Sequence, residues 1–325
     1  MKTSDKIYIA GHTGLVGSAI IRLLEGKGFT NIVTSTSSNL DLREQNQVKQ
    51  FFKKEKPQYV FLAAAKVGGI MANQTYPAEF IYDNLLIQSN IINEAYHNEV
   101  EKLLFLGSSC IYPKNALQPI REEYLLSDYL EPTNDAYAIA KIAGIKMCQA
   151  YAKQYGCRFI SVMPTNLYGP CDNYNIQNAH VLPALIRKFH EAKIAEKDNV
   201  TVWGTGSPRR EFLHVDDAAN ACFFLMENYE HTEIINIGLG KDNTIAEIAL
   251  LIKEITRFEG KLVFDESKPD GTPRKLLNVD KINALGWHSQ IDLENGIRNT
   301  YTDFEERYDY YVTQKERTVF GNNNV

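Results

Sequence analysis

Short apolar runs alternate with longer amphipathic stretches over the first half of the chain. Residues 7–10, 59–62, 102–106 and 158–163 are apolar or β-branched and have the length of buried strands. Between them, apolar residues recur at helical spacing in 15–24, 45–56, 78–97 and 135–155. Strands that alternate with helices in this way predict an α/β fold built on a doubly wound parallel sheet.

The remainder of the chain predicts a smaller α/β lobe that closes over the cleft of the sheet. In the first part of the chain, a second strand is also expected at 31–35. Later in the chain we expect helices at 182–192 and 244–258 and a further strand within 234–240. We expect a dinucleotide-binding domain at 1–170, with returning segments at about 211–240 and 290–312. The second lobe then comprises 171–210 and 241–289. The polar tail after Tyr311 is expected to fray.

A glycine-punctuated loop joins the first strand to the first helix. Its spacing is GxxGxxG rather than GxGxxG. Glycines permit a tight turn and let the backbone approach a pyrophosphate, whose charge then lies at the helix N-terminus. The position therefore predicts dinucleotide binding by the loop residues Gly11, His12, Thr13, Gly14, Leu15, Val16 and Gly17.

The second strand runs into a stretch of hydroxyl side chains, residues 35–39. An Asp or Glu at this place would bind the 2′-hydroxyl of NAD and repel the 2′-phosphate of NADP. Because no acid stands there, the sequence favours NADP over NAD. The alternative interpretation is a plain polar turn.

Tyr137 and Lys141 are one helical turn apart and share a helix face. An ammonium there favours the phenolate, which makes the tyrosine a better proton shuttle near neutral pH. Ser108 and Cys110 directly follow a strand end, where ligands of such sheets bind. Each residue also has a purely structural interpretation. These are helix packing for the Tyr–Lys pair, a cap for Ser108 and a small buried residue for Cys110.

Residues 202–217 carry further candidate chemistry. Arg209 and Arg210 have the planar fork that pairs with phosphate, and Trp203 offers a surface for a base or a sugar. The alternative is a solvated Arg pair beside a core Trp. His180, taken alone, is more typical of a structural histidine.

Composition excludes several classes of function. The formal net charge of −5 gives no overall attraction to nucleic acid or anionic lipid. Five cysteines without a CxxC pair indicate a reducing compartment rather than a disulfide framework or a metal site. With no apolar leader and no apolar run of about 20 residues, we expect a cytoplasmic protein that does not span a membrane.

These motifs together resemble the extended short-chain dehydrogenase/reductases that act on nucleotide sugars. The glycine loop, Ser108, the Tyr137–Lys141 pair and residues 210–217 (Arg-Glu-Phe-Leu-His-Val-Asp-Asp) carry this resemblance. More specifically, residues 63–70, 107–113, 131–134, 161–169 and 267–275 look like the GDP-L-fucose synthase family, over about residues 6 to 310. The resemblance implies a Rossmann-type sheet, NADP as cofactor and GDP-4-keto-6-deoxy-D-mannose as substrate. That sugar is epimerised at C3 and C5 and then reduced at C4.

The resemblance also implies roles for individual residues. Ser108, Tyr137 and Lys141 form the reductase set, and Cys110 and His180 are the base and acid of epimerisation. The GDP-sugar is expected to contact Lys188, Trp203, Arg210 and Asp270. Beyond the glycine loop, the cofactor is expected to contact Ser37, Asp41, Leu42, Lys141, Pro164, Thr165, Asn166, Leu167 and His180.

Three positions depart from the family pattern. Bacterial members often have Arg where this chain has Thr13 and Ser37, and Arg is common at Lys188. Two alternatives stay open, an enzyme for another GDP-4-keto-deoxy sugar (a 3,6-dideoxy-hexose or 6-deoxy-heptose) and a catalytically silent dinucleotide-binding regulator. The resemblance further implies a homodimer joined through helices 78–97 and 136–155.

Overall fold

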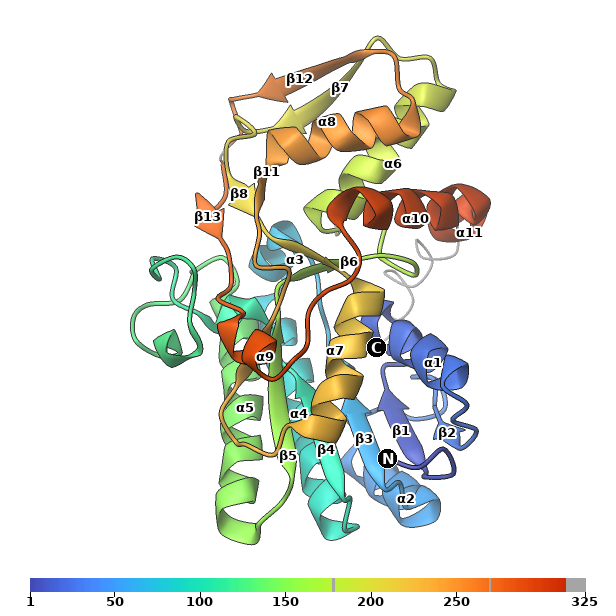
Figure 1. Cartoon of the computed structure of the whole chain (residues 1–325), viewed down its shortest axis with the longest axis vertical. Coiled ribbons are helices and arrows are strands. Elements are labelled where there is room, and N and C mark those ends of the chain that lie inside the picture. The colour runs from blue at the N-terminus through green and yellow to red at the C-terminus, as the bar shows by residue number, and fades with distance from the viewer. Residues whose placement is uncertain (177–178, 269, 314–325) are drawn as a thin grey trace.

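A six-stranded parallel sheet lies at the centre of the chain, in the order β10-β5-β4-β3-β1-β2 (Figure 1). The computed structural model describes residues 1–176, 179–268 and 270–313. The strands are β1 (Ile7–Ala10), β2 (Ile32–Val33), β3 (Tyr59–Leu62), β4 (Lys102–Leu106), β5 (Phe159–Pro164) and β10 (Ile235–Ile237). The predicted doubly wound α/β sheet is confirmed.

Helices cover both faces of this sheet. On one face α4 (Pro77–His97) packs against α5 (Asp135–Tyr155) and α2 (Gln45–Glu55), and on the other α1 (Leu15–Gly26) packs against α7 (Val215–Asn228). Strands β1, β3, β4 and β5 are buried along their whole length, as expected for strands covered on both faces. Full burial of each Val, Leu, Ile or Phe side chain contributes about 1.5–3 kcal/mol.

The second strand is shorter than the sequence predicted. Only Ile32 and Val33 pair with β1, whereas the expected strand covered 31–35. The polar residues that follow leave the sheet at its edge, because Thr34 is already exposed and Ser35 has no strand partner.

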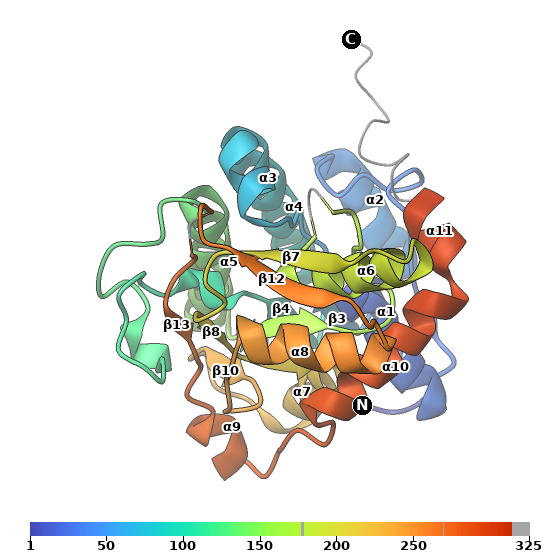
Figure 2. The same ribbon diagram turned by 90° about the horizontal axis from the view of Figure 1, so that it is seen from above.

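A second core is built from later parts of the chain. It packs α6 (Val181–Ile194), α8 (Ile245–Thr256) and α10 (Leu293–Glu306) around the parallel pair β7 (Asn199–Trp203) and β12 (Lys261–Asp265). Figure 1 shows this group at the top of the view, and Figure 2 shows α8 and β12 from above. Helix α8 begins with a capping box in which Thr244 and Glu247 exchange hydrogen bonds.

The two cores divide the chain differently from the expected boundaries in two places. Ile297, Phe304 and Tyr311, expected to return to the dinucleotide domain, belong to the second core. Conversely, Leu277 and Trp287, expected in the second lobe, pack into the first core. The C-terminal helix α11 (Tyr308–Thr313) continues past Tyr311, and the rest of the expected frayed tail lies outside the described residues.

Two short strand groups among the described residues join the two cores. Strands β6 (Asn166–Tyr168) and β9 (Phe212–His214) pair in parallel. Strand β8 (Arg209–Arg210) lies between β11 (Asn243–Thr244), which is antiparallel to it, and β13 (Arg274–Lys275), which is parallel to it. Short helices complete the chain, namely α3 (Ile70–Thr75), η1 (Ser109–Ile111), η2 (Glu122–Tyr124) and α9 (Asp280–Ala284).

Candidate active site

Parallel pairing places the carboxyl ends of the six strands at one edge of the sheet. Ala10 pairs with Leu62 across β1 and β3, and Leu106 pairs with Val162 across β4 and β5. The segments that follow these ends carry the glycine loop, Ser108 and Thr165, so the fold brings these candidate groups to one edge. Open α/β sheets bind their ligands beyond this edge.

The glycine loop has no room for side chains at two of its glycines. A Cβ atom on Gly17 would lie 2.1 Å from the Gly11 carbonyl oxygen, and one on Gly11 would lie 2.7 Å from the Ala64 backbone nitrogen. Gly11 also has a φ of +86°, which favours glycine. Helix α1 starts at Leu15 with no side-chain cap and no acidic residue in its first turn. Its N-terminus therefore fits a pyrophosphate.

The segment after β2 holds the adenosine-end candidates. Ser37 is exposed, as the hydroxyl-rich stretch predicted. Asp41 is held by Arg43 through a bidentate contact, with Nη2 2.7 Å from Oδ2, and Arg43 also reaches Asp83 of α4 at 3.3 Å. The Arg43 guanidinium lowers the pKa of Asp41. Asp41 thus stays ionised and fixes this turn against α4.

Ser108, Tyr137 and Lys141 meet between the end of β4 and the start of α5. The Ser108 hydroxyl hydrogen-bonds with Tyr137 and also accepts the Cys110 backbone N–H at 3.2 Å. Lys141 is buried and donates to the Leu106 carbonyl at 2.8 Å, with its Nζ atom 5.8 Å from the centroid of the Tyr137 ring. Ser108 therefore acts as a cap, as its structural interpretation predicted, and it also contacts Tyr137.

The expected effect of Lys141 on Tyr137 is not found. Burial and the neighbouring Cys110 sulfur raise the pKa of Tyr137, while the Ser108 hydrogen bond acts in the opposite direction. Burial lowers the pKa of Lys141 to about 7. The prediction of a phenolate was wrong because desolvation disfavours the charged forms of both residues. This effect outweighs the attraction between the two charges. Tyr137 is accordingly a protonated acid at neutral pH.

Cys110 lies beside a lysine to which the sequence analysis assigned no role. The Lys275 Nζ atom, on β13, is 3.6 Å from the Cys110 Sγ atom. The Lys275 ammonium is thus placed to donate a hydrogen bond to this sulfur. A purely structural role for Cys110, as an inert packed residue, does not account for this contact.

His180 stands at the N-cap of α6. His180 is exposed, and partial desolvation lowers its pKa. The Lys275 ammonium acts in the same direction. Lys275 is therefore electrostatically linked to both Cys110 and His180, and Cys110 is linked to Tyr137, so the five predicted catalytic residues form one connected group.

Two of the four predicted sugar-nucleotide contacts lie together on α6 and β7. The Lys188 Nζ atom lies 5.6 Å from the centroid of the exposed Trp203 indole, and that of Lys268 lies 5.8 Å from it. Burial lowers the pKa of Lys188. An exposed indole flanked by two ammonium groups suits a base and its attached phosphates.

Arg210 lies on β8, and Asp270 lies in the segment between β12 and β13. Asp270 accepts hydrogen bonds from the Thr205 backbone N–H at 2.9 Å and the Thr205 hydroxyl at 2.7 Å. Burial lowers the pKa of Arg210, and Asp270 opposes this. The Arg210 guanidinium donates to the Arg209 carbonyl at 2.8 Å.

Arg209 is not free to bind phosphate as the sequence suggested. Its Nε atom donates to Asp242 at 2.8 Å, and Asp242 also pairs with Arg274 at 2.5 Å. This carboxylate clamps β8, β11 and β13 together. The sequence analysis missed Asp242 because no local pattern joins residues 33 positions apart.

The predicted nicotinamide segment 164–167 bridges β5 and β6. The Thr165 N–H donates to Ile237, and the Thr165 hydroxyl and Asn166 amide donate to the Glu211 carbonyl at 3.3 and 2.8 Å. These bonds fix the segment at the carboxyl edge of the sheet. Glu211 is a third residue whose place sequence reasoning missed, after Lys275 and Asp242, although it lies inside the 210–217 motif.

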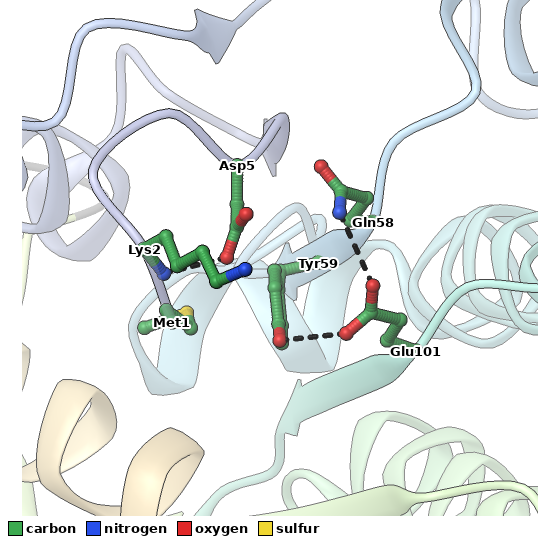
Figure 3. Close-up of a pocket in the computed structure, with 6 residues that line it drawn as sticks. All are labelled: Met1, Lys2, Asp5, Gln58, Tyr59 and Glu101. Atoms are coloured by element: carbon green, nitrogen blue, oxygen red, sulfur yellow. Dashed lines mark hydrogen bonds between the residues drawn. The ribbon is translucent and has the colours of Figure 1, made fainter.

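The cavity drawn in Figure 3 lies at the opposite edge of the sheet. It has a volume of about 260 Å³, and Gln58 and Tyr59 in its wall both donate to Glu101 at 3.1 and 2.7 Å. The Glu101 contact and burial raise the pKa of Tyr59 to about 12. These polar groups satisfy one another, and none of the candidate residues lines this cavity.

The parallel sheet, the glycine loop and the Ser108–Tyr137–Lys141 set define a dinucleotide-dependent enzyme of the short-chain dehydrogenase class. A sequence model of the NAD dependent epimerase/dehydratase family matches residues 7–238. GDP-L-fucose synthase 1 of Arabidopsis thaliana is 61% identical over 298 residues, which cover 92% of each chain. The chain belongs to this epimerase/dehydratase family and, within it, to the GDP-L-fucose synthases.

Two solved structures extend the comparison. A GDP-L-fucose synthetase from Naegleria fowleri, bound to NADP, superimposes with a TM-score of 0.89 at 33% identity over 95% of this chain and 96% of that one. A GDP-6-OMe-4-keto-L-xylo-heptose reductase from C. jejuni gives a TM-score of 0.90 at 40% identity, over 94% of this chain and 99% of that one. Within the described part of the chain, no helix is long and apolar enough to cross a membrane.

Proposed function

We propose that this enzyme converts GDP-4-keto-6-deoxy-D-mannose to GDP-L-fucose. It epimerises C3 and C5 and then reduces the C4 ketone with NADPH. The observation that carries the proposal is the contact of two proton-transfer sets at one edge of the sheet. Cys110, with Lys275 3.6 Å from its sulfur, lies directly beside Tyr137 and its partner Ser108.

Epimerisation beside a ketone needs a base, an acid and a holder for the oxygen. The Cys110 thiolate, stabilised by Lys275, removes the proton from C3 or C5. His180 supplies a proton to the opposite face. The hydroxyls of Ser108 and Tyr137 donate hydrogen bonds to the ketone oxygen while it carries negative charge as an enolate.

Reduction uses the same oxygen holders. NADPH, when bound, supplies the hydride to C4. Tyr137 then gives its phenolic proton to the C4 oxygen, and its raised pKa keeps that proton in place at neutral pH until it is needed. A proton from solvent then returns to the Tyr137 phenolate and completes the cycle.

The residues present fit NADP. The uncapped N-terminus of α1 would hold the pyrophosphate, and Lys141 would hold the nicotinamide ribose. The exposed Ser37 offers a hydroxyl to a 2′-phosphate and places no carboxylate against it. His12, Thr13, Leu42 and residues 164–167 complete the proposed cofactor contacts.

The proposed GDP site uses Lys188, Trp203, Arg210 and Asp270 in the half of the molecule that contains the second core. The two cores thus correspond to a cofactor domain and a GDP-sugar domain. We further propose a cytoplasmic homodimer joined through α4 and α5. Tyr82 on α4 and Ile139 on α5 are exposed apolar side chains that support such an interface.

A related activity is the second candidate. The likeness to the C. jejuni heptose reductase favours a GDP-4-keto-heptose as an alternative substrate. Incubation with GDP-4-keto-6-deoxy-D-mannose and NADPH, with the product assigned by NMR, tests the main proposal. GDP-L-fucose is the expected product. No turnover of this substrate, with turnover of a GDP-4-keto-heptose, would assign the second activity instead.

A further inference from the structure

We propose that Glu211 is a positioning residue for epimerisation, which holds Lys275 against the Cys110 sulfur. Glu211 touches neither the sulfur nor any candidate substrate contact, so it acts through the segment that contains Lys275. The inference rests on the proposed function because Cys110 is the base only in that reaction.

Glu211 holds this segment at Lys275 itself and at Leu277, two residues further along. Its backbone N–H donates to the Lys275 carbonyl at 3.3 Å, and its Oε2 atom accepts the Leu277 backbone N–H at 2.9 Å. These bonds hold the backbone at the end of β13, where Lys275 pairs with Arg210 of β8. Lys275 therefore reaches Cys110 from a constrained base.

The carboxylate is itself fixed by the first core. Its Oε1 atom accepts the Gly240 N–H at 2.7 Å, in the segment that follows β10. A Cβ atom on Gly238 would lie 2.3 Å from the same oxygen, so the backbone approaches the carboxylate as closely as a glycine allows. Glu211 thus connects the central sheet to the strand that contains Lys275.

The burial of the Glu211 carboxylate needs a reason. Glu211 is completely inaccessible to solvent, and burial raises its pKa while the N–H donors of Leu277 and Gly240 lower it. A buried carboxylate is costly unless its oxygens are satisfied. A glutamine here would keep one acceptor but turn an amide NH₂ toward one of the two N–H donors. The charge is therefore suited to holding two donors at once.

The test measures how fast iodoacetamide alkylates Cys110 as a function of pH. Mass spectrometry of the Cys110 peptide gives the rate, and the Cys157 peptide of the same sample is the internal control. Thiolate is the reacting form, so the rate reports contact with Lys275. The proteins are the unsubstituted chain, Glu211→Gln, Lys275→Met and the double variant.

We expect Glu211→Gln to lower the Cys110 alkylation rate at pH 7 by about fivefold, a change of about 1 kcal/mol. Its pH midpoint should move upward, as in Lys275→Met, and the double variant should show no further loss. The Cys157 rate should not change. If Glu211→Gln does not fold, Glu211→Asp, which withdraws the carboxylate from both donors, should give the same result.

Either of two outcomes would overturn the proposal. One is an unchanged Cys110 rate in a folded Glu211 variant, with Lys275→Met slowed. The other is an equal loss from Glu211→Gln with and without Lys275, since the residues would then act independently. Alkylation needs no sugar substrate. A wrong assignment of the reaction would appear separately, as absent deuterium exchange into the sugar by the unsubstituted enzyme.

Discussion

The Lys275 Nζ atom lies 3.6 Å from the Cys110 Sγ atom, although 165 positions separate the two residues. The same ammonium lowers the pKa of His180. One cation therefore contacts the proposed base and disfavours the charged form of the proposed acid.

Lys275→Met should raise the pKa of His180. Removing the ammonium leaves desolvation as the only cause of the lowered value, so the pKa should move toward 6.5 without reaching it. NMR titration of the His180 imidazole measures this shift. Lys261→Met, on exposed β12, is the control and should leave it unchanged. A His180 pKa unaffected by Lys275→Met would show that burial alone sets it.

Cys110→Ser should separate the two half-reactions. An alcohol is a far weaker base than a thiolate, so exchange of the C3 and C5 protons with D₂O should cease. Reduction should survive in part, giving a GDP-6-deoxy sugar with its original C3 and C5 configuration. The control variant Cys157→Ser, which changes a thiol on a distant loop, should exchange the C3 and C5 protons at the normal rate. Deuterium at C3 or C5 at the unsubstituted rate would exclude Cys110 as the base.

Tyr137→Phe should lower kcat of reduction by about 100-fold or more, because the C4 oxygen loses its proton donor. GDP-sugar binding should change little, since the proposed contacts of the nucleotide lie on α6, β7 and β8. Steady-state kinetics and calorimetric binding measure the two effects. Tyr155→Phe, on the exposed end of the same helix, is the control. Near-normal turnover by Tyr137→Phe would refute the proposed role.

Ser37→Asp should move cofactor preference toward NADH. A carboxylate at this exposed position repels a 2′-phosphate and accepts a hydrogen bond from a 2′-hydroxyl. The ratio of kcat/KM for NADPH and NADH gives the preference. Asn31→Asp adds the same charge at the other end of the strand and should leave the ratio unchanged. An unaltered ratio in Ser37→Asp would place the 2′-phosphate elsewhere.

The buried Lys141 should make the stability of the cofactor-free enzyme rise with pH. Its pKa is about 7 when folded and 10.5 in its ordinary state. Between these values the unfolded chain binds a proton that the folded chain does not, so raising the pH favours folding. Urea unfolding from pH 7.5 to 9.5 should show this rise, and Lys141→Met should lack that part of it. If the stabilities of the two proteins changed in parallel with pH, the lowered pKa of Lys141 would be contradicted.

Much of the fold was readable from periodicity and strand length. The four apolar runs became β1, β3, β4 and β5, and the helix bounds agree closely, because burial on both sides imposes continuous apolar strands. The edge strand β2 was overestimated, since Thr34 and Ser35 have strand propensity but no partner to pair with. Propensity alone does not determine where a sheet edge ends.

The candidate site was readable where its residues follow strand ends or share a helix turn, as Ser108 and Lys141 do. Lys275, Glu211 and Asp242 were not found, because their partners are brought close only by tertiary folding. The direction of the Tyr137 pKa was also missed. Spacing indicates which groups are near each other, whereas desolvation depends on everything packed around them.

The Asp242 clamp sets a limit on engineering by recombination. Arg209, Asp242 and Arg274 come from three separate stretches of sequence, yet one carboxylate satisfies both guanidinium groups. A chimera that takes 241–275 from a relative with another sugar specificity would take positions 242 and 274 from that relative but keep the host's Arg209. If the relative had an arginine at 274 but no acid at 242, two cations would face each other across the seam. The natural unit of exchange is therefore the three strands together rather than any continuous segment.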